Sequence, residues 1–184
     1  MRLETKRLIL REWRDEDRAP FAAIIGDPEV RRFFPTLGTR ADADAGIDRA
    51  IARLAEHRMS FLPVVDKTND AFLGMTGLAP IPDETRAAIP SHPEVEIGWQ
   101  LDESCWGQGY APEAAQAWLD YAWDVLNLPE VVAFTAVLNR PSQRVMEKLG
   151  MIRTPDDDFE HPGVPEGHKL RPHVLYRIGN PRLR

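Results

Sequence analysis

The segment from Glu94 to Ala114, EVEIGWQLDESCWGQGYAPEA, constrains the fold of this chain more than any other. Its alternating first part predicts a strand, after which a short polar turn leads into a glycine-bearing loop and a helix. Gly107 and Gly109 lack a Cβ, so the backbone there can turn tightly and approach a ligand closely. Pro112 suits the first helical position, where its missing N–H costs nothing. The free N–H groups from Gly107 to Ala111 would converge at the positive end of the helix dipole, which predicts an anion cradle suited to a diphosphate.

The size and composition of the chain are those of one globular domain. It has 184 residues, of which 43% are hydrophobic and 28% are charged, enough to bury a substantial core. The net charge of −6 argues against a protein that coats nucleic acid or an anionic membrane and tolerates a cationic amine substrate. No segment approaches the ~20 apolar residues that span a bilayer, and the charged N-terminus is unlike a signal peptide. We therefore expect a single domain over residues 1–184, located in the cytoplasm, with no nucleic-acid or membrane partner.

The apolar periodicity predicts a mixture of helices and strands. Helices are expected at residues 15–27, 39–57, 112–126 and 142–149, and strands at 8–10, 61–66, 72–78, 94–101, 131–138 and 174–178. Asp15 is expected to cap the first helix, and Thr39 and Asp42 have capping-box spacing at the second. Residues 79–93 and 154–171 are expected to be loops. The order predicts a mixed α/β layer fold with one central sheet.

Taken alone, the glycine loop is a weak signal. Pro112 stands where a dinucleotide-binding fingerprint needs its third glycine, and the chain has no Gly-Lys pair for a Walker loop. A tight turn that needs glycine only for its geometry is the alternative that the loop leaves open.

Four segments together carry a more specific resemblance: ETKRLILREW, EIGWQL, WGQGYAPEA and NRPSQRVMEKLG, in that order. They closely resemble the GCN5-related N-acetyltransferase (GNAT) superfamily, and most of all its branch of ribosomal-protein N-terminal alanine acetyltransferases. Trp106 departs from the superfamily pattern, which has Gln or Arg there, but tryptophan is usual in this branch. The resemblance covers residues 3–177. It implies a mostly antiparallel sheet that is splayed between its fourth and fifth strands and flanked by helices.

The resemblance also implies acetyl-CoA as co-substrate and transfer of its acetyl group to a primary amine, either a small molecule or a protein N-terminus. Homodimers are common among such folds, although no feature of the sequence demonstrates one. The residues that would bind the cofactor are the backbone groups of Trp99, Leu101, Gly107, Gln108, Gly109, Tyr110 and Ala111, with Asn139, Ser142 and Arg144. Ser142 is also a candidate catalytic residue, yet it stands equally well as the N-cap of the following helix. Arg144 and Arg140 could contact the phosphates of the cofactor or lie exposed to solvent, and the sequence does not distinguish these alternatives.

Glu96 is the candidate general base. It lies on the strand face opposite Val95, Ile97 and Trp99, where a carboxylate facing a cleft could deprotonate an ammonium directly or through water. Burial would raise its pKa toward a useful range. Glu94 shares that face but lies nearer the loop, and a solvent-facing Glu96 is the plain alternative. Catalysis can also rest on proximity alone, with solvent taking the proton.

Two other functions are weighed against the transferase. A CoA-binding regulatory module would keep the cradle without turnover. A cysteine hydrolase would use Cys105, the only cysteine, but the flanking residues do not match the motifs of such enzymes. The five histidines form no HxxxH or HxH pair, so no metal site is expected.

The acceptor side is the least specified part of the sequence. By family analogy the loop before the last strand, with the acidic run at Asp156, Asp157 and Asp158, would help to line the acceptor groove and could steer a cationic amine. The aromatic candidates for the pocket are Trp13, Phe33, Phe34 and Trp99, of which the Phe33-Phe34 pair is preferred. The sequence does not choose among a protein N-terminus, an amino acid, a polyamine and a drug-like amine.

Overall fold

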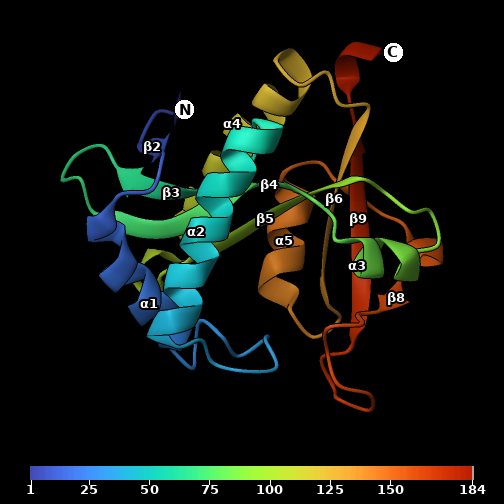
Figure 1. Ribbon diagram of the computed structural model, residues 1–184. Coiled ribbons are helices and arrows are strands. Elements are labelled where there is room, and N and C mark those ends of the chain that lie inside the picture. The colour runs from blue at the N-terminus through green and yellow to red at the C-terminus, as the bar shows by residue number, and fades with distance from the viewer. Residues whose placement is uncertain (184) are drawn as a thin grey trace. The chain divides into compact units, whose positions relative to one another are not determined.

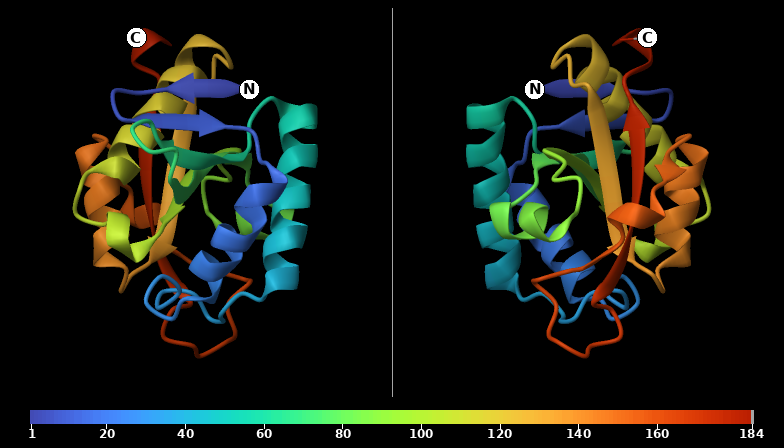
Figure 2. Two further views of the ribbon diagram at one scale, coloured as in Figure 1. Left: turned by 90° about the vertical axis from the view of Figure 1, so that its left-hand side faces the viewer. Right: turned by 90° about the vertical axis from the view of Figure 1, so that its right-hand side faces the viewer.

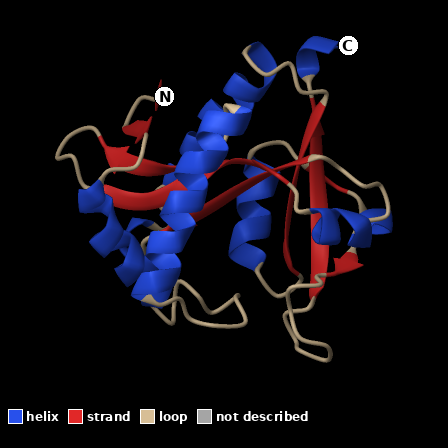
Figure 3. Ribbon diagram, in the orientation of Figure 1, coloured by secondary structure: helices blue, strands red, loops and turns tan. Residues whose placement is uncertain are grey.

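The computed structural model describes residues 1–183. The chain forms two compact units, the first made of Met1–Ala79 with Gly98–Trp118 and the second of Pro80–Ile97 with Leu119–Arg184. Strand β5 (Val95–Leu101) and helix α4 (Tyr110–Asp124) each contribute residues to both units. Figure 1 labels these elements, and Figure 3 shows the same view by secondary structure.

The first unit is a sheet with two helices packed on it. The sheet runs β1 (Arg2–Glu4), β2 (Leu8–Arg11), β3 (Phe61–Asp66), β4 (Phe72–Pro80) and then β5. A short 3-10 turn, η1 (Asp15–Asp17), leads into α1 (Arg18–Gly26), which is followed by α2 (Arg40–His57). Both views of Figure 2 show α1 and α2 beside each other. Phe21, Ile25, Ala43 and Ile47 bury their side chains between these helices, and Phe72 and Met75 of β4 pack against this cluster.

The second unit is built on the long antiparallel pair β6 (Glu130–Ala136) and β9 (Pro172–Gly179). Two short strands, β7 (Ile152–Arg153) and β8 (Phe159–Glu160), pair with β9, and β5 runs parallel to β6 with Glu96 opposite Val132. The helices are α3 (Asp83–Ala88) and α5 (Arg140–Lys148), with the 3-10 turns η3 (Pro155–Asp157) and η4 (Pro181–Leu183). Side chains alternate across a strand. One face therefore packs Val132 and Leu175 against Ile89 beside α3, while Tyr176 on the other face donates to Glu147 of α5 at 3.5 Å.

The expected fold class is confirmed: the chain is a mixed α/β protein with a mostly antiparallel sheet flanked by helices. The capping box is also confirmed, because Thr39 accepts from the N–H of Asp42 and the Asp42 carboxylate accepts from the N–H of Thr39. Within the described part of the chain, no helix has both the length and the apolar character needed to cross a membrane.

Four local predictions were wrong. Residues 79–93 are not only a loop, because helix α3 forms within them. The three short strands β1, β7 and β8 were not predicted, because two or three residues are too few to show an alternating pattern. Helix α4 begins at Tyr110, so Pro112 is its third residue and not its first. The position is still tolerated, because N–H groups of the first turn lack intrahelical partners. Asp15 does not cap the first helical segment. Arg14 is the N-cap residue of η1, and its N–H donates to the carboxylate of Asp17 at 2.8 Å.

Candidate functional site

The cradle loop joins the 3-10 turn η2 (Glu103–Cys105) to α4, and glycine is required in it for conformation. Gly107 and Gly109 have φ of 75° and 80°, in the left-handed region that side chains disfavour. A Cβ on Gly107 would meet nothing within 4 Å, so glycine there serves only the backbone angle. A Cβ on Gly109 would lie 3.6 Å from Nη2 of Arg7.

The backbone amides of the cradle are available to a ligand. Among the described residues, no acceptor is within hydrogen-bonding reach of the N–H groups from Gly107 to Ala111. The first N–H groups of an α-helix have no partner within the helix and lie at its positive end. A run of such donors around two left-handed glycines suits the oxygens of a phosphate or diphosphate.

Arg7, in the turn between β1 and β2, braces this loop. Its Nη1 donates to the carbonyl oxygen of Gln108 at 3.0 Å, and its Nε donates to the carboxylate of Glu113 at 2.6 Å. The same carboxylate accepts from the Thr5 hydroxyl at 2.6 Å and from the Arg7 N–H at 2.9 Å. Because a trans peptide points its C=O and N–H in opposite directions, holding the Gln108 carbonyl turns the N–H of Gly109 away from Arg7.

The charge balance of this brace favours an ionised carboxylate. Burial raises the pKa of Glu113, but the hydrogen bonds from Thr5 and Arg7 outweigh it and leave the pKa below its usual value. The Arg7 guanidinium also lies 4.3 Å from the ring centre of Tyr110, whose hydroxyl donates to Asp66 at 3.3 Å. Sequence reasoning missed this brace, although ETKRLILREW was among the segments that carried the family resemblance.

Strand β5 turns the backbone groups of Trp99 and Leu101 away from β4. The Asp102 N–H donates to Leu73 of β4 at 2.9 Å, and the Gly98 carbonyl accepts from the Thr76 hydroxyl of β4 at 2.8 Å. In a ladder of this kind every second residue faces the same neighbour. The backbone groups of Trp99 and Leu101 therefore face away from β4, the direction in which a cofactor would have to lie if they bind it. The Leu101 carbonyl accepts from Trp106 Nε1 at 3.0 Å.

In the second unit, the predicted cap of α5 is not Ser142. Asn139 is the N-cap: its Oδ1 accepts from the N–H of Ser142 at 3.2 Å, while its Nδ2 donates to Thr135 at 2.9 Å. The correction is physical, since Asn is as good a cap as Ser and Pro141 suits the first turn. Ser142 is half-buried, and its hydroxyl has no hydrogen-bond partner among the described residues. Arg144 is exposed, whereas Arg140 donates to Gln143 at 2.9 Å.

The two acidic candidates on β5 differ in environment. Glu96 is half-buried within the strand, where it is in register with Val132 of β6. Glu94 is exposed and precedes the strand. Of the two, Glu96 is the one whose side chain is partly shielded from solvent.

Cys105 has the properties of a structural thiol. It is buried, and burial raises its pKa, which is the opposite of what a nucleophilic cysteine requires. The Ser104 hydroxyl lies 3.8 Å from its sulfur. No group of three or more His, Cys, Asp or Glu side chains within residues 1–183 is arranged to hold a metal ion.

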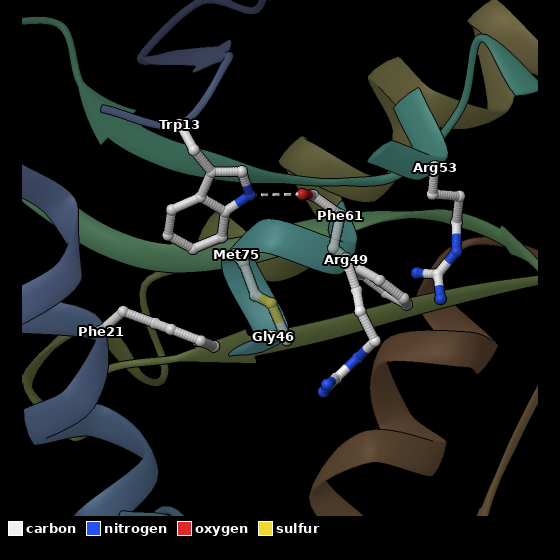
Figure 4. Close-up of a pocket in the computed structure, with 7 residues that line it drawn as sticks. All are labelled: Trp13, Phe21, Gly46, Arg49, Arg53, Phe61 and Met75. Atoms are coloured by element: carbon white, nitrogen blue, oxygen red, sulfur yellow. Dashed lines mark hydrogen bonds between the residues drawn. The ribbon is translucent and has the colours of Figure 1, made fainter. Parts of the chain in front are cut away.

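A small pocket opens in the first unit, with a volume of about 190 Å³. Figure 4 shows the residues that line it: Trp13, Phe21, Gly46, Arg49, Arg53, Phe61 and Met75. Trp13 was among the aromatic residues proposed for an acceptor pocket. Phe33 and Phe34, the preferred pair, do not line it and instead lie beneath the guanidinium groups of Arg32 and Arg31.

The acidic run in the loop before β9 is largely neutralised within the second unit. Asp157 is buried against Arg177 and also accepts from the N–H of Ser91 at 3.0 Å. Asp158 pairs with Arg153 at 2.5 Å. These carboxylates therefore hold the loop together, which is a structural role that a run of charges in the sequence does not reveal.

Comparison with known proteins gives consistent results. The family model described as "Acetyltransferase (GNAT) domain" matches residues 7–152. The chain is 30% identical over 179 residues to "Uncharacterized N-acetyltransferase YnaD" of Bacillus subtilis, covering 97% of this chain and 96% of that protein. A GNAT-family acetyltransferase structure from Bacillus anthracis is similar with a TM-score of 0.78 and 25% identity, covering 98% and 99% of the two chains. The ribosomal-protein-S5-alanine acetyltransferase of Vibrio fischeri matches with a TM-score of 0.73 and 17% identity, covering 100% and 99%, and so shares the fold.

Proposed function

This chain belongs to the GNAT family of acetyltransferases, and we propose that it moves an acetyl group from acetyl-CoA to a primary amine. We further propose that residues 1–184 act as a single N-acetyltransferase domain, because β5 and α4 each supply residues to both units. The enzyme class follows from the family. The cofactor, the acceptor and the residue roles are the proposal.

The observation that carries the proposal is the row of unengaged amides from Gly107 to Ala111. Left-handed glycines hold the row open, and Arg7 orients it. These donors fit the diphosphate of a CoA thioester, and the outward-facing backbone of Trp99 and Leu101 fits its amide-bearing arm. Bound acetyl-CoA would supply an activated acetyl group, whose C–S bond is exchanged for a C–N bond to the amine while the amine proton ends on the released thiol.

The remaining candidates take supporting roles. Asn139 and Ser142 would contact the cofactor from the start of α5, since the Ser142 hydroxyl and the second N–H of the Asn139 amide are not engaged in the described hydrogen bonds. Arg144, exposed on the same helix, would meet its phosphates. Glu96 would accept the amine proton directly or through water, which is the step that makes the nitrogen nucleophilic.

The test is calorimetric titration with acetyl-CoA. Gly109→Glu places bulk, a strained φ and a negative charge in the cradle, and we expect its affinity to fall by about a hundredfold or more. Gly150→Glu is the matched control, because Gly150 has φ of 75° and open space at its Cβ but ends α5 outside the cradle. Absence of acetyl-CoA binding to the native protein, or equal losses in both variants, would refute the proposal.

A CoA-binding module without turnover is the alternative function. It would bind acetyl-CoA in the same titration but release no thiol with any amine. In that case Glu96→Gln would change nothing measurable, whereas a general base at this position predicts a loss of roughly 10²-fold in turnover. If solvent takes the proton, the variant would turn over normally.

The acceptor amine is a protein N-terminus or a small molecule. The resemblance to the ribosomal-protein alanine acetyltransferases favours the first, and the similarity to the Vibrio fischeri enzyme supports it only at the level of the fold. The pocket in the first unit is relevant to the other possibility, a small-molecule amine.

A further inference from the structure

Two arginines, Arg49 and Arg53, are among the residues that line the pocket in the first unit. Arg49 and Arg53 line it from α2, and neither makes a hydrogen bond or an ion pair with the described residues. The neighbouring arginines are different: Arg18 pairs with Asp48 at 2.7 Å and Arg40 with Asp44 at 3.0 Å. Arg49 is exposed and Arg53 is half-buried. Two guanidinium groups that line one concave site and have no ion-pair partner among the described residues favour an anionic ligand.

The geometry of α2 brings these two cations together. Gly46, Arg49 and Arg53 follow one another at the three- and four-residue spacing that places side chains on one helix face. Figure 4 shows both arginine side chains among the residues that line the pocket. The nearby acid that senses the Arg49 charge is Asp42, whose carboxylate is engaged by Thr39 in the capping box.

Gly46 keeps the pocket open. Glycine inside a helix destabilises it relative to alanine, so its presence at the middle of α2 calls for a reason. A Cβ there would lie 3.9 Å from Arg49 Nη2 and 4.0 Å from Phe21 Cε1, so the backbone would accept a side chain. The lack of a side chain at Gly46 therefore leaves space between Arg49 and the ring of Phe21.

The rest of the pocket is apolar. Trp13 and Phe21 lie with ring centres 5.1 Å apart, and Phe61 and Met75 complete the lining. The one polar atom of the indole, Nε1, already donates to the Phe61 carbonyl at 2.8 Å. The arginines are thus the groups that remain to fix a ligand's orientation.

The pocket adjoins the strand that we assign to the cofactor arm. A Cβ built on Gly98 would lie 3.0 Å from Cε1 of Phe61, so the ring that lines the pocket also packs on β5 beside Trp99. A ligand in the pocket would therefore lie close to the backbone along which the thioester is proposed to bind.

We propose that the acceptor is a small amine that also carries a carboxylate and an apolar body, as an apolar or aromatic free amino acid does. Arg49 and Arg53 would hold the carboxylate through their forked N–H groups. The aromatic rings that line the pocket, those of Trp13, Phe21 and Phe61, would contact the apolar side chain of the ligand. The volume of about 190 Å³ is below the roughly 300–1,000 Å³ of sites for drug-sized ligands. Two unpaired cations disfavour a polyamine, which has no anion to offer. This inference rests on the proposed transferase function and specifies its substrate.

A set of matched amines tests the choice of acceptor. L-phenylalanine, L-phenylalaninamide and 2-phenylethylamine share the ring and the amine but differ in the carboxylate, and the leucine and methionine sets do the same. With saturating acetyl-CoA and thiol release as the readout, we expect kcat/KM for the amino acid to exceed that of its partners by about ten- to a hundredfold. Equal or better use of the amides and simple amines would overturn the inference.

A binding measurement separates this inference from the transferase proposal. The probe is 3-phenylpropionate, which has the carboxylate and ring but no amine to react, titrated calorimetrically. Arg49→Gln and Arg53→Gln should each weaken its binding by about ten- to a hundredfold, while acetyl-CoA affinity stays unchanged. Arg40→Gln removes the same charge from the same helix outside the pocket and should bind both ligands normally.

The outcomes are distinct. Failure of acetyl-CoA to bind would refute the transferase proposal and, with it, the acceptor assignment. Normal acetyl-CoA binding, with no carboxylate binding or with equal binding in all variants, would overturn the acceptor assignment alone. A loss of acetyl-CoA affinity in Arg49→Gln or Arg53→Gln would also overturn it, because these residues would then belong to the cofactor site.

Discussion

At the scale of single residues, Arg7 connects the amino-terminal hairpin to the cradle. Its Nε pairs with Glu113 in the first turn of α4, and its Nη1 holds the carbonyl of Gln108 within the loop. Both partners are more than a hundred residues away in sequence. Arg7 is therefore a positioning residue, since it acts on a ligand through the peptide that it orients.

Replacing Arg7 should affect the cofactor more than the chemistry. In Arg7→Gln the Glu113 carboxylate loses its charged partner, and the Gln108 peptide is free to rotate. We expect KM for acetyl-CoA to rise about tenfold with little change in kcat, and stability to fall by about 1–3 kcal/mol. Arg2→Gln is the control, because Arg2 is exposed on the same hairpin and pairs only locally with Glu4. Unchanged acetyl-CoA affinity in Arg7→Gln would show that the loop keeps its shape without the brace.

At the scale of elements, α5 shows how a cap and a ligand site can share residues. The Asn139 side chain satisfies the N–H of Ser142 and is itself held by Thr135 at the end of β6. Strand β6 ends at Ala136 and α5 begins at Arg140, so the cap lies in the short connection between them and holds Ser142 in the first turn of α5.

The cap assignment predicts a stability difference between two neighbouring variants. Asn139→Ala should lower the free energy of unfolding by about 1 kcal/mol through loss of the cap. Ser142→Ala should change it by less than about 0.5 kcal/mol, because the serine contributes its backbone N–H and not its hydroxyl. Denaturant titrations of the two variants test this directly. A larger loss for Ser142→Ala would return the capping role to the serine hydroxyl.

At the scale of the whole molecule, the half-buried His173 makes folding depend on pH. His173 on β9 packs against Phe159 and His161, with ring centres 5.6 and 4.8 Å away. Burial lowers the pKa of His173 to about 4, only partly offset by its hydrogen bond with the Arg171 carbonyl. In the unfolded chain the pKa returns to about 6.5. Between these values the unfolded chain binds a proton that the folded chain does not, so folding loses stability as the pH falls through this window.

The expected loss is up to about 3 kcal/mol between pH 6.5 and pH 4. We expect the free energy of unfolding, measured with denaturant at pH 7, 6 and 5, to decline in the native protein and to decline less in His173→Phe. His57→Gln is the control, because His57 is exposed at the end of α2. If the free energy of unfolding falls equally with pH in His173→Phe and in the native protein, groups other than His173 cause the pH dependence.

The sequence alone was sufficient to predict features that depend only on residues close together in the chain. The Thr39–Asp42 box, the left-handed glycines of the cradle and the alternation of β5 all follow from a few neighbouring residues, because caps, φ angles and side-chain direction are short-range properties. With the family resemblance, they were enough for the fold class, the order of the main elements and the acetyltransferase family.

Only the tertiary structure decided which distant groups meet. The Arg7–Glu113 brace joins residues 106 positions apart, and the pocket joins Trp13 to Arg53 and Met75 through packing of α1, α2 and β4. It also showed that Asp157 and Asp158 of the acidic run form internal ion pairs, whereas Arg49 and Arg53 form none with residues 1–183. The physical reason is the same in each case: a charge's role depends on its partners, and partners distant in sequence are brought together only by the packed fold.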